Sequence, residues 1–233
     1  MGRIVLIAGG SRGIGLAVAR ALLAQGDTVR IAARASQRLD ALRTEFPGCV
    51  EAVDLGRAEE VEAWVARQPR VDALVHCAGD FASGAPSALR SAQLETLFQS
   101  NVLSALNSFG AARPGLRASK GAALFFGTAG LAQPRGRRTS AGYSAMKSAL
   151  WVLVRSWALE EAAHGVRVNL LSPGLVPHDD AEPGTHDVAR QAGVPLGRAA
   201  GLAEIVGAAR WLVGPDSGYV TGVNLEVAGG WLA

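Results

Sequence analysis

Apolar, β-branched runs of five or six residues alternate with longer amphipathic stretches along almost the whole chain. Buried strands that alternate with helices pair in parallel, because each strand returns to the sheet through a right-handed helical crossover. The pattern therefore predicts an α/β fold, in which a doubly wound parallel sheet of seven strands is flanked by helices. The expected strands are Arg3–Ala8, Thr28–Ala33, Cys49–Val53, Asp72–Cys77, Ala122–Phe126, Val166–Leu171 and Val223–Val227, and the expected helices cover 14–25, 37–46, 58–67, 91–112, 142–163 and 202–213.

The composition is typical of a globular protein in a reducing compartment. Hydrophobic residues make up 49% and charged residues 18% of the 233 residues, which is enough for a core and excludes a disordered chain. No linker or repeat divides the sequence, so we expect a single domain over residues 1–233. No run of about 18 apolar residues could span a membrane, and the apolar start at Ile4–Ala8 is too short for a signal peptide. Cys49 and Cys77 do not make a disulfide framework, so we expect a cytoplasmic protein.

The net charge of +3 is too small to indicate a nucleic-acid partner. Nearly all the positive charge is arginine, and only Lys120 and Lys147 are lysines. Because arginine stays protonated near neutral pH, the position of each titratable amine is informative.

A glycine-rich loop joins the first expected strand to the first expected helix. Glycine permits a tight turn and lets the backbone approach a pyrophosphate, and the helix N-terminus then offers free N–H groups. The spacing of Gly9, Gly13 and Gly15 differs from G-x-G-x-x-G, but its place after an N-terminal strand indicates a dinucleotide site. A glycine-rich turn without a ligand is the alternative.

The end of the second expected strand favours NADP over NAD. An NAD site usually has a carboxylate about 20 residues past the loop, where it binds the ribose hydroxyls. This chain has no acid there, and Arg34 is placed to meet a 2′-phosphate together with Arg12 and with Ser36 or Arg38 nearby. Alternatively, these arginines are solvated at helix starts. Asp54, after the third strand, is a candidate partner of the adenine amino group or a cap of the following turn.

Tyr143 and Lys147 lie four residues apart at the start of a long expected helix, so their side chains share one face. A free phenol has a pKa of about 10, but a neighbouring cation stabilises the phenolate and brings that pKa toward the working range. Such a tyrosine can protonate a developing alkoxide while a nicotinamide delivers hydride. Y-x-x-x-K on its own also occurs by chance.

Two loops interrupt the alternation, at 127–142 and 173–201. Each follows an expected strand, and the loops at the carboxyl ends of strands line the ligand crevice of an open α/β sheet. Both loops are candidate walls of the site or ordinary surface connections.

Taken together, these residues resemble the short-chain dehydrogenase/reductase family, and the resemblance covers essentially the whole chain. Six motifs occur in the family's order. They are Gly9, Gly13 and Gly15 of TGxxxGxG, with Ala8 in place of the threonine; Ala78 and Gly79 of NNAG, here preceded by His76 and Cys77; Asn101; Tyr143 and Lys147 of YxxxK; Pro173 and Gly174; and the C-terminal segments Tyr219–Gly222 and Ala228–Gly230.

The resemblance implies a Rossmann fold that binds NADP(H) and transfers hydride. It implies that Tyr143 is the acid, that Lys147 tunes the tyrosine pKa and binds ribose, and that Asn101 holds a relay water to the lysine. The adenine is expected near Asp54 and Leu55. The complete set of expected cofactor-binding residues is Gly9, Ser11, Arg12, Gly13, Ile14, Gly15, Arg34, Asp54, Leu55, Ala78, Gly79, Tyr143, Lys147, Pro173, Gly174 and Val176, the last three near the nicotinamide.

The resemblance also implies a homotetramer or a homodimer. The family packs the long helices after the fourth and fifth strands between subunits. The apolar residues that could serve there would also suit any core-facing helix, and they are Leu94, Leu97, Phe98, Trp151, Leu153 and Trp157.

The chain departs from the family at one catalytic position. The family places a serine shortly before the tyrosine to bind the substrate carbonyl, and no serine occurs in residues 126–133. Thr128 is our candidate replacement, provided that Arg135–Arg138 is a short insertion, because threonine offers the same hydroxyl. A backbone N–H in this role, or a chain that has lost catalysis, is the alternative.

Two charged segments carry less weight. His178–Asp180 with His186 could be drawn as a metal site, but we interpret it as a flexible acidic loop and expect no metal. It falls in the expected substrate lid, 175–194, which is short and predicts an open pocket. Arg135, Arg137 and Arg138 are interpreted as a solvated loop, with contact to an acidic substrate or a phosphopantetheine carrier as the alternative hypothesis.

The expected function is the NADPH-dependent reduction of a carbonyl substrate. A 3-oxoacyl thioester, a pterin and a small ketone are the candidate acceptors. The alternative is an NADP(H)-binding sensor or scaffold without turnover, which the missing serine supports. We expect a small-molecule substrate and further copies of the chain as partners, and neither nucleic acid nor a membrane.

Overall fold

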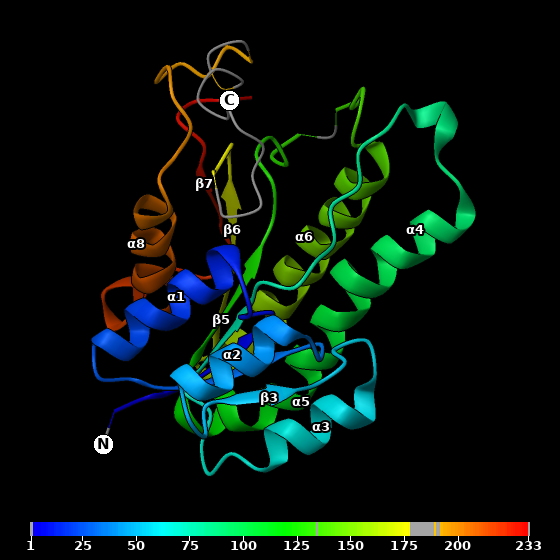
Figure 1. Cartoon of the computed structure of the whole chain (residues 1–233). Coiled ribbons are helices and arrows are strands. Elements are labelled where there is room, and N and C mark those ends of the chain that lie inside the picture. Colours follow the sequence, from blue (N-terminus) through cyan, green and yellow to red (C-terminus); the bar gives the residue numbers. More distant parts are fainter. Residues whose placement is uncertain (1, 134, 178–188, 190–191, 233) are drawn as a thin grey trace.

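Seven parallel strands form one sheet in the order β3-β2-β1-β4-β5-β6-β7 (Figure 1). The computed structural model describes residues 2–133, 135–177, 189 and 192–232. From β1 the chain builds one half of the sheet outward to β3 and then returns to the other side of β1, so the strand order reverses between β1 and β4. The predicted fold class is confirmed. The strands are β1 Ile4–Ala8, β2 Thr28–Ala33, β3 Val50–Ala52, β4 Ala73–His76, β5 Ala122–Phe126, β6 Arg167–Pro173 and β7 Asn224–Val227.

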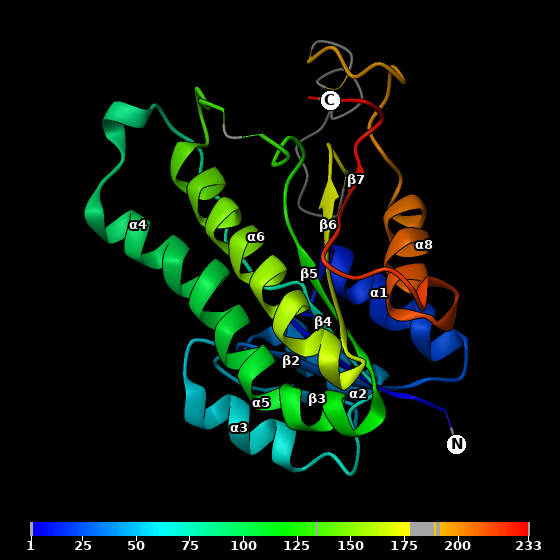
Figure 2. The same cartoon turned by 180° about the vertical axis from the view of Figure 1, so that it is seen from behind.

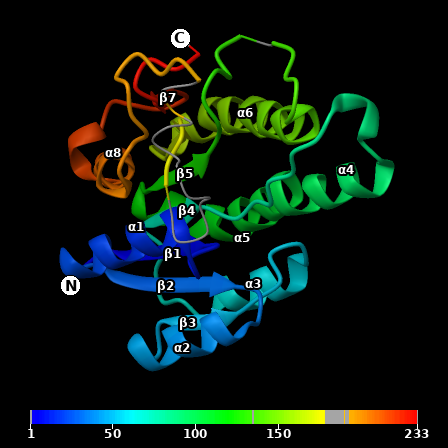
Figure 3. The ribbon, with the colours of Figure 1, turned by 45° about the horizontal axis from the view of Figure 1, so that its top comes forward.

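Helices cover both faces of the sheet (Figures 1 and 2). The apolar side chains of α1, α2 and α8 pack on one face, and those of α3, α5 and α6 pack on the other. Figure 3 shows the strands between these two layers. The helices are α1 Gly13–Ala24, α2 Gln37–Glu45, α3 Ala58–Ala66, α4 Ser91–Phe98, α5 Ser104–Ser119, α6 Ala141–Glu161 and α8 Leu202–Val213, with short 3-10 helices at Pro86–Ala88, Ala162–His164 and Pro215–Ser217.

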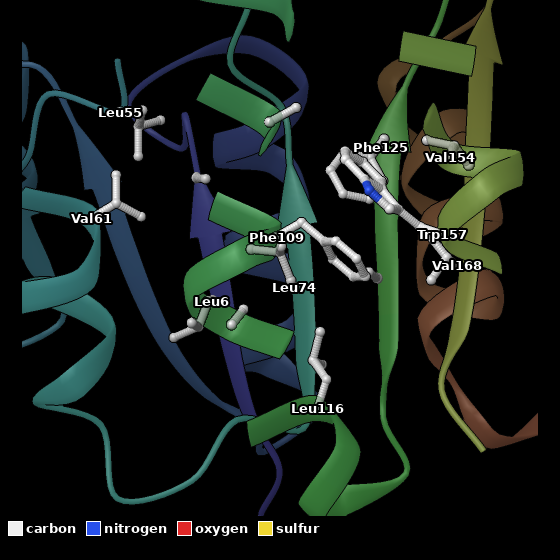
Figure 4. Close-up of a cluster of buried hydrophobic side chains, with 14 of the residues drawn as sticks. Leu6, Leu55, Val61, Leu74, Phe109, Leu116, Phe125, Val154, Trp157 and Val168 are labelled. Atoms are coloured by element: carbon white, nitrogen blue, oxygen red, sulfur yellow. The ribbon is translucent and has the colours of Figure 1, made fainter. Parts of the chain in front are cut away.

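The central strands are buried on both sides because their side chains alternate between two apolar clusters, whereas the edge strands β3 and β7 are only partly buried. In β5, Phe125 enters the cluster under α3, α5 and α6, whereas Leu124 enters the cluster under α1, α2 and α8. Phe109 of α5 and Trp157 of α6 pack beside Phe125 (Figure 4). Their ring centroids lie 4.7 Å apart for Phe109 and Trp157 and 5.2 Å apart for Phe125 and Trp157. This aromatic group fixes the two long helices to the middle of the sheet.

The helix predicted over 91–112 is interrupted in the structure. α4 ends at Phe98, and Gln99–Leu103 forms a π-helical turn before α5 begins. Apolar periodicity does not reveal such a turn, because the sequence on either side keeps a helical pattern. The turn matters for the site because it contains Asn101.

The same helix also continues beyond its predicted end. α5 runs through Pro114 to Ser119, although proline normally favours an earlier end. It continues because Leu116 is fully buried and because Gly115 lies so close to the chain before β4 that a Cβ there would be 2.9 Å from Val71 Cβ. Within the described part of the chain, no helix is both long and apolar enough to cross a membrane.

Phe109→Ala is expected to lower the free energy of unfolding by about 3–5 kcal/mol, because it removes a buried ring and leaves a cavity. Urea denaturation measures this difference. Thr44→Ala, at an exposed position of α2, is the control and should change the free energy by less than about 0.5 kcal/mol. A loss in Phe109→Ala no larger than that of the control would contradict the packing.

Candidate active site at the carboxyl ends of the strands

The residues predicted to bind the cofactor gather at one edge of the sheet. Apart from Tyr143 and Lys147 on α6, they follow the carboxyl ends of strands or lie in the first turn of α1, around the point where the strand order reverses. In open α/β sheets this is the place where ligands bind. After β1 lie Gly9, Ser11, Arg12, Gly13, Ile14 and Gly15; after β2, Arg34; after β3, Asp54 and Leu55; after β4, Ala78 and Gly79; and at the end of β6, Pro173, Gly174 and Val176.

The loop between β1 and α1 requires glycine at several positions. Gly9 and Gly13 have φ values of 89° and 52°, a conformation that side chains rarely adopt. A Cβ on Gly9 would overlap the backbone nitrogen of Ala78, and a Cβ on Gly15 would overlap the carbonyl oxygen of Gly9. The first turn of α1 has no acidic residue, and its N-cap residue is Arg12, whose side chain accepts no hydrogen bond. The turn therefore suits an anion such as a pyrophosphate.

Arg34, after β2, reaches across this edge to Asp80, after β4. Arg34 Nη2 donates to Asp80 Oδ1 at 3.3 Å, and the Arg34 side chain is 73% exposed. An ion pair this exposed contributes little in water, so the guanidinium can exchange its partner for another anion. Asp80 is not among the predicted residues. The signal that could have found it is its place directly after the Ala78–Gly79 motif.

Asp54 and Ser36 have local structural roles. Asp54 Oδ1 accepts a hydrogen bond from the backbone N–H of Gly56 at 3.0 Å, which is the turn cap foreseen as one of its two roles. Ser36 Oγ accepts from the N–H of Leu39 at 3.2 Å and caps α2. The Asp54 side chain is exposed, whereas Leu55 beside it is buried in the core. The Leu55 side chain therefore packs in the core and is not available to contact an adenine ring directly.

A buried polar cluster lies where the end of β4, the π-helical turn and α6 meet. Asn101 is fully buried, and its Nδ2 donates to the carbonyl oxygens of Asp80 and Leu97, each at 3.0 Å. Its Oδ1 is buried without a hydrogen-bond partner among the described residues. A Cβ on Gly79 would overlap Asn101 Oδ1 and lie 3.3 Å from Lys147 Nζ. The amide oxygen and the ammonium group therefore face the same small space, which only glycine leaves open.

Tyr143 and Lys147 occupy the first two turns of α6. Lys147 is 4% exposed, and its Nζ donates to the carbonyl oxygen of Phe126 at 2.8 Å. Burial lowers the pKa of Lys147 to about 8, so the amine still carries a proton at neutral pH. Its Nζ lies 5.6 Å from the centre of the Tyr143 ring, which meets Phe81 edge-on. Burial raises the pKa of Tyr143 to about 12, which is opposite to the lowering expected from the neighbouring lysine, so this phenol keeps its proton.

His76, the last residue of β4, contacts the helix next to this cluster, a role that the sequence did not indicate. Its Nε2 lies 3.0 Å from Ser104 Oγ, whose hydroxyl donates to the carbonyl oxygen of Ser100 at 2.6 Å. Nε2 must therefore be the protonated ring nitrogen. Burial and, to a lesser extent, the charge of Lys147 lower the pKa of His76 to about 3, so the ring stays neutral. The imidazole thus ties β4 to the helix that presents Asn101.

Thr128 lies two residues beyond the end of β5 and is partly buried. The next residue, Ala129, donates its backbone N–H to the carbonyl oxygen of Pro173 at 3.1 Å, so this segment continues to run beside β6. Phe126, two residues before Thr128, is the acceptor of Lys147. Thr128 is therefore held at the same edge as the lysine, on a segment anchored on both sides.

The end of β6 packs against the C-terminal motif. The N–H of Gly174 donates to the carbonyl oxygen of Val227 at 3.0 Å. A Cβ on Gly174 would lie 2.8 Å from the Cα of Ala228, so a larger residue would push the two segments apart. Val176 packs on the apolar cluster that includes α1. The three residues predicted near a nicotinamide thus form a wall fixed to β7.

The interpretation of the arginine cluster as solvated holds for two of its three members. Arg135 and Arg138 are exposed, but Arg137 is partly buried. Arg137 Nη2 donates to the carbonyl oxygens of Ala129 at 2.7 Å and Gly130 at 3.2 Å. Burial and then the charge of Arg135 lower the pKa of Arg137. The prediction of a solvated side chain is wrong for Arg137, because these two carbonyl groups bind its guanidinium. A sequence does not reveal such backbone acceptors.

The remaining candidates are the acidic segment with its two histidines and the buried thiol of Cys77. His178–Asp180 and His186 lie outside the described residues, as does much of the expected lid over 175–194. Elsewhere in the described chain, no group of three or more His, Cys, Asp or Glu side chains could hold a metal ion. Burial raises the pKa of Cys77 to about 12, so its thiol stays protonated and is a poor nucleophile.

Lys147→Met tests the buried charge through pH-dependent stability. The pKa of Lys147 falls from 10.5 to about 8 on folding. Between these values the unfolded chain binds more protons than the folded one, so the wild type gains stability as the pH rises. The free energy of unfolding of wild type minus that of Lys147→Met should therefore increase by about 2 kcal/mol between pH 7 and pH 9.5.

Urea denaturation of both proteins at each pH measures that difference. Lys120→Met is the matched control, because Lys120 is the other lysine and its side chain is exposed. A difference for Lys147→Met that stays as flat with pH as the control's would mean that the amine is not desolvated on folding.

Comparison with known proteins agrees with the motifs. Residues 8–232 match the family model described as enoyl-(acyl carrier protein) reductase. The chain is 32% identical to L-fucose dehydrogenase from Oryctolagus cuniculus over 98% of this chain and 84% of that protein. It is 29% identical to the 3-oxoacyl-(acyl-carrier-protein) reductase of Escherichia coli strain K12, over 98% and 97% of the two chains.

A solved structure shows the same likeness in three dimensions. The crystal structure of an oxidoreductase of the short-chain dehydrogenase/reductase family from Burkholderia thailandensis superposes with a TM-score of 0.89 and 31% identity. The superposition covers 100% of this chain and 93% of the other. The resemblance carried by the six motifs is thereby confirmed, and the chain belongs to the short-chain dehydrogenase/reductase family of oxidoreductases.

Proposed function

We propose that this protein is an NADPH-dependent reductase of a carbonyl substrate, with Tyr143 as its acid. The observation that carries the proposal is the pairing of Tyr143 and Lys147 on α6 beside the buried Asn101 Oδ1, which has no hydrogen-bond partner in the described part of the chain. A 3-oxoacyl thioester is the first acceptor class to test, since the similar Escherichia coli protein is named a reductase of such compounds. Other relatives carry other substrate names, so pterins and small ketones belong in the same test.

A nicotinamide dinucleotide fits the residues present. The glycine loop leaves no room for side chains at Gly9 and Gly15, and the first turn of α1 has no acid to repel a pyrophosphate. Arg34 and Arg12 are the candidate ligands of a 2′-phosphate, which favours NADP(H) over NAD(H). The Pro173–Val176 segment would line the nicotinamide. When bound, this group supplies the hydride that reduces the carbonyl carbon.

The chain's own residues would move and hold the proton. Tyr143 donates its hydroxyl proton to the substrate oxygen as negative charge develops there. The protonated Lys147, 5.6 Å from the phenol ring, favours the phenolate that results. Thr128 would donate its hydroxyl hydrogen bond to the same substrate oxygen. Asn101 Oδ1 would accept a hydrogen bond from a water that also binds Lys147, and the lysine would return a proton to the tyrosine.

We further infer a homodimer or homotetramer in the cytoplasm, formed through the long helices. Of the residues predicted to serve there, Leu97 and Trp157 are buried in the core, whereas Phe98 is 43% exposed. Leu106, Val152 and Leu159 on α5 and α6 are also exposed, and together with Phe98 they support a contact between subunits. The cysteines Cys49 and Cys77 are both free, which suits a reducing compartment.

Tyr143→Phe should lower kcat about 100-fold or more, because it removes the hydroxyl that donates the proton. The measurement follows NADPH oxidation against diketones, 3-oxoacyl thioesters and oxidised pterins. Tyr219→Phe is the matched control, since Tyr219 is the other tyrosine and is fully exposed. Thr128→Ser should retain or raise turnover, and Thr128→Val should lower it.

Silence of the wild type across the whole panel, with NADPH still bound tightly, would favour the alternative of a sensor or scaffold. Turnover that survives in Tyr143→Phe would remove the tyrosine from the mechanism. Equal turnover in Thr128→Ser and Thr128→Val would transfer the carbonyl contact to a backbone N–H.

Arg34→Gln should weaken NADPH binding about 10- to 100-fold, because a hydrogen bond to a charged phosphate is lost. Binding of NADH, which lacks the 2′-phosphate, should change little. Fluorescence titration of both cofactors measures the ratio, and Arg43→Gln on the exposed face of α2 is the control. Equal weakening of NADPH and NADH would contradict the role of Arg34 in choosing the cofactor.

A further inference from the structure

The segment directly after Thr128 is hydrogen-bonded at every backbone group. Ala129 donates its N–H to the carbonyl oxygen of Pro173 at 3.1 Å, and its own carbonyl oxygen accepts from Arg137 at 2.7 Å. Gly130 donates its N–H to Glu226 Oε1 at 3.0 Å, and its carbonyl oxygen accepts from Arg137 at 3.2 Å. The four groups therefore use three separate elements as partners: β6, β7 and the loop before α6.

Arg137 and Glu226 hold this segment from opposite directions. Arg137 donates to two successive carbonyl groups with one nitrogen, and Glu226 accepts from the N–H between them. The carboxylate of Glu226 is itself positioned, because Asn224 Nδ2 donates to it at 3.4 Å and Asn224 Oδ1 accepts from the Ser172 hydroxyl at 2.6 Å. We call Arg137, Glu226 and the backbone of Ala129 and Gly130 that they bind the brace. Through Asn224 and Ser172 the brace continues into the paired strands β6 and β7 (Figures 1 and 2).

The position of Gly130 shows how closely the brace fits. Gly130 has a φ of 75°, and a Cβ there would lie 2.8 Å from Arg137 Nη2 and 3.0 Å from Leu232 Cβ. The chain can turn at this point only because glycine leaves space for the Arg137 guanidinium and for Leu232. Thr128 is two residues before this turn, so any shift of the turn moves its hydroxyl.

We propose that Arg137, together with Glu226, is a positioning residue that fixes the Thr128 hydroxyl against the substrate oxygen. The inference rests on the proposed reductase function and gives a structural task to an arginine of the loop before α6 that the sequence alone had suggested to be solvated. Arg137 acts through the backbone of Ala129 and Gly130 and touches no reacting atom. A flexible Thr128 would spend less time in the productive geometry, and misplacement by about 1 Å can cost a rate factor of about 100.

Arg137→Gln is the first test, with Arg138→Gln as the matched control from the exposed part of the same loop. We expect kcat with the best acceptor to fall about 10- to 100-fold in Arg137→Gln, with NADPH affinity unchanged. Arg137→Lys keeps a cation that can donate to one carbonyl group and should restore part of the loss. Wild-type kcat in Arg137→Gln would overturn the proposal.

A double-mutant cycle with Thr128→Ala separates positioning from general structural support. If Arg137 acts through the threonine hydroxyl, Arg137→Gln should have little further effect in the Thr128→Ala background. Losses that simply multiply would overturn the proposal. So would an increased KM for acidic acceptors with unchanged kcat, which would assign Arg137 to substrate binding instead.

Amide hydrogen exchange of the folded protein tests the brace without any turnover. Exchange at Ala129 and Gly130 should become faster in Arg137→Gln and remain as in the wild type in Arg138→Gln. If the wild type reduces none of the acceptors but this local acceleration occurs, the brace stands and the proposed reductase function fails. Equal exchange in both variants would overturn the brace, whatever the activity.

Discussion

The buried ammonium group of Lys147 links several parts of this structure. A charge in the protein interior needs a hydrogen-bond acceptor, and the carbonyl oxygen of Phe126 provides it at 2.8 Å. That bond ties α6 to the end of β5, where Thr128 begins its segment. The same charge helps to keep His76 neutral and lies beside the space that Gly79 leaves open. The same amine therefore joins α6 to β5 and lies in the candidate active site.

Most of the fold could be predicted because its strands and helices differ strongly in apolar pattern. All seven strands were placed within one or two residues, since the central ones are buried on both faces and apolar runs with turn residues at their ends mark the others. The helix over 91–112 was the exception. Its π-helical turn and its continuation through Pro114 depend on contacts with β4, Val71 and the core, and these contacts involve residues distant in the sequence.

The candidate site could be predicted where its residues lie close together in the sequence. The glycine loop and the Tyr143–Lys147 pair are of this kind, because a single turn of chain brings their members together. Asp80, His76 and Arg137 were missed or misjudged, because each has a partner on another element. For Arg137 the partners are two backbone carbonyl groups, and a sequence does not show which carbonyl groups lack a backbone hydrogen bond.

The π-helical turn at Gln99–Leu103 has a consequence for how this site tolerates change. Each residue of an α-helix rotates the chain by about 100°, so the extra residue in the turn sets the rotational phase between α4 and α5. Deleting one residue there would change this phase by about 100° and with it the direction in which Asn101 faces Lys147. At this position the length of the turn matters beside the identity of its residues, and a deletion reports on it where single substitutions do not.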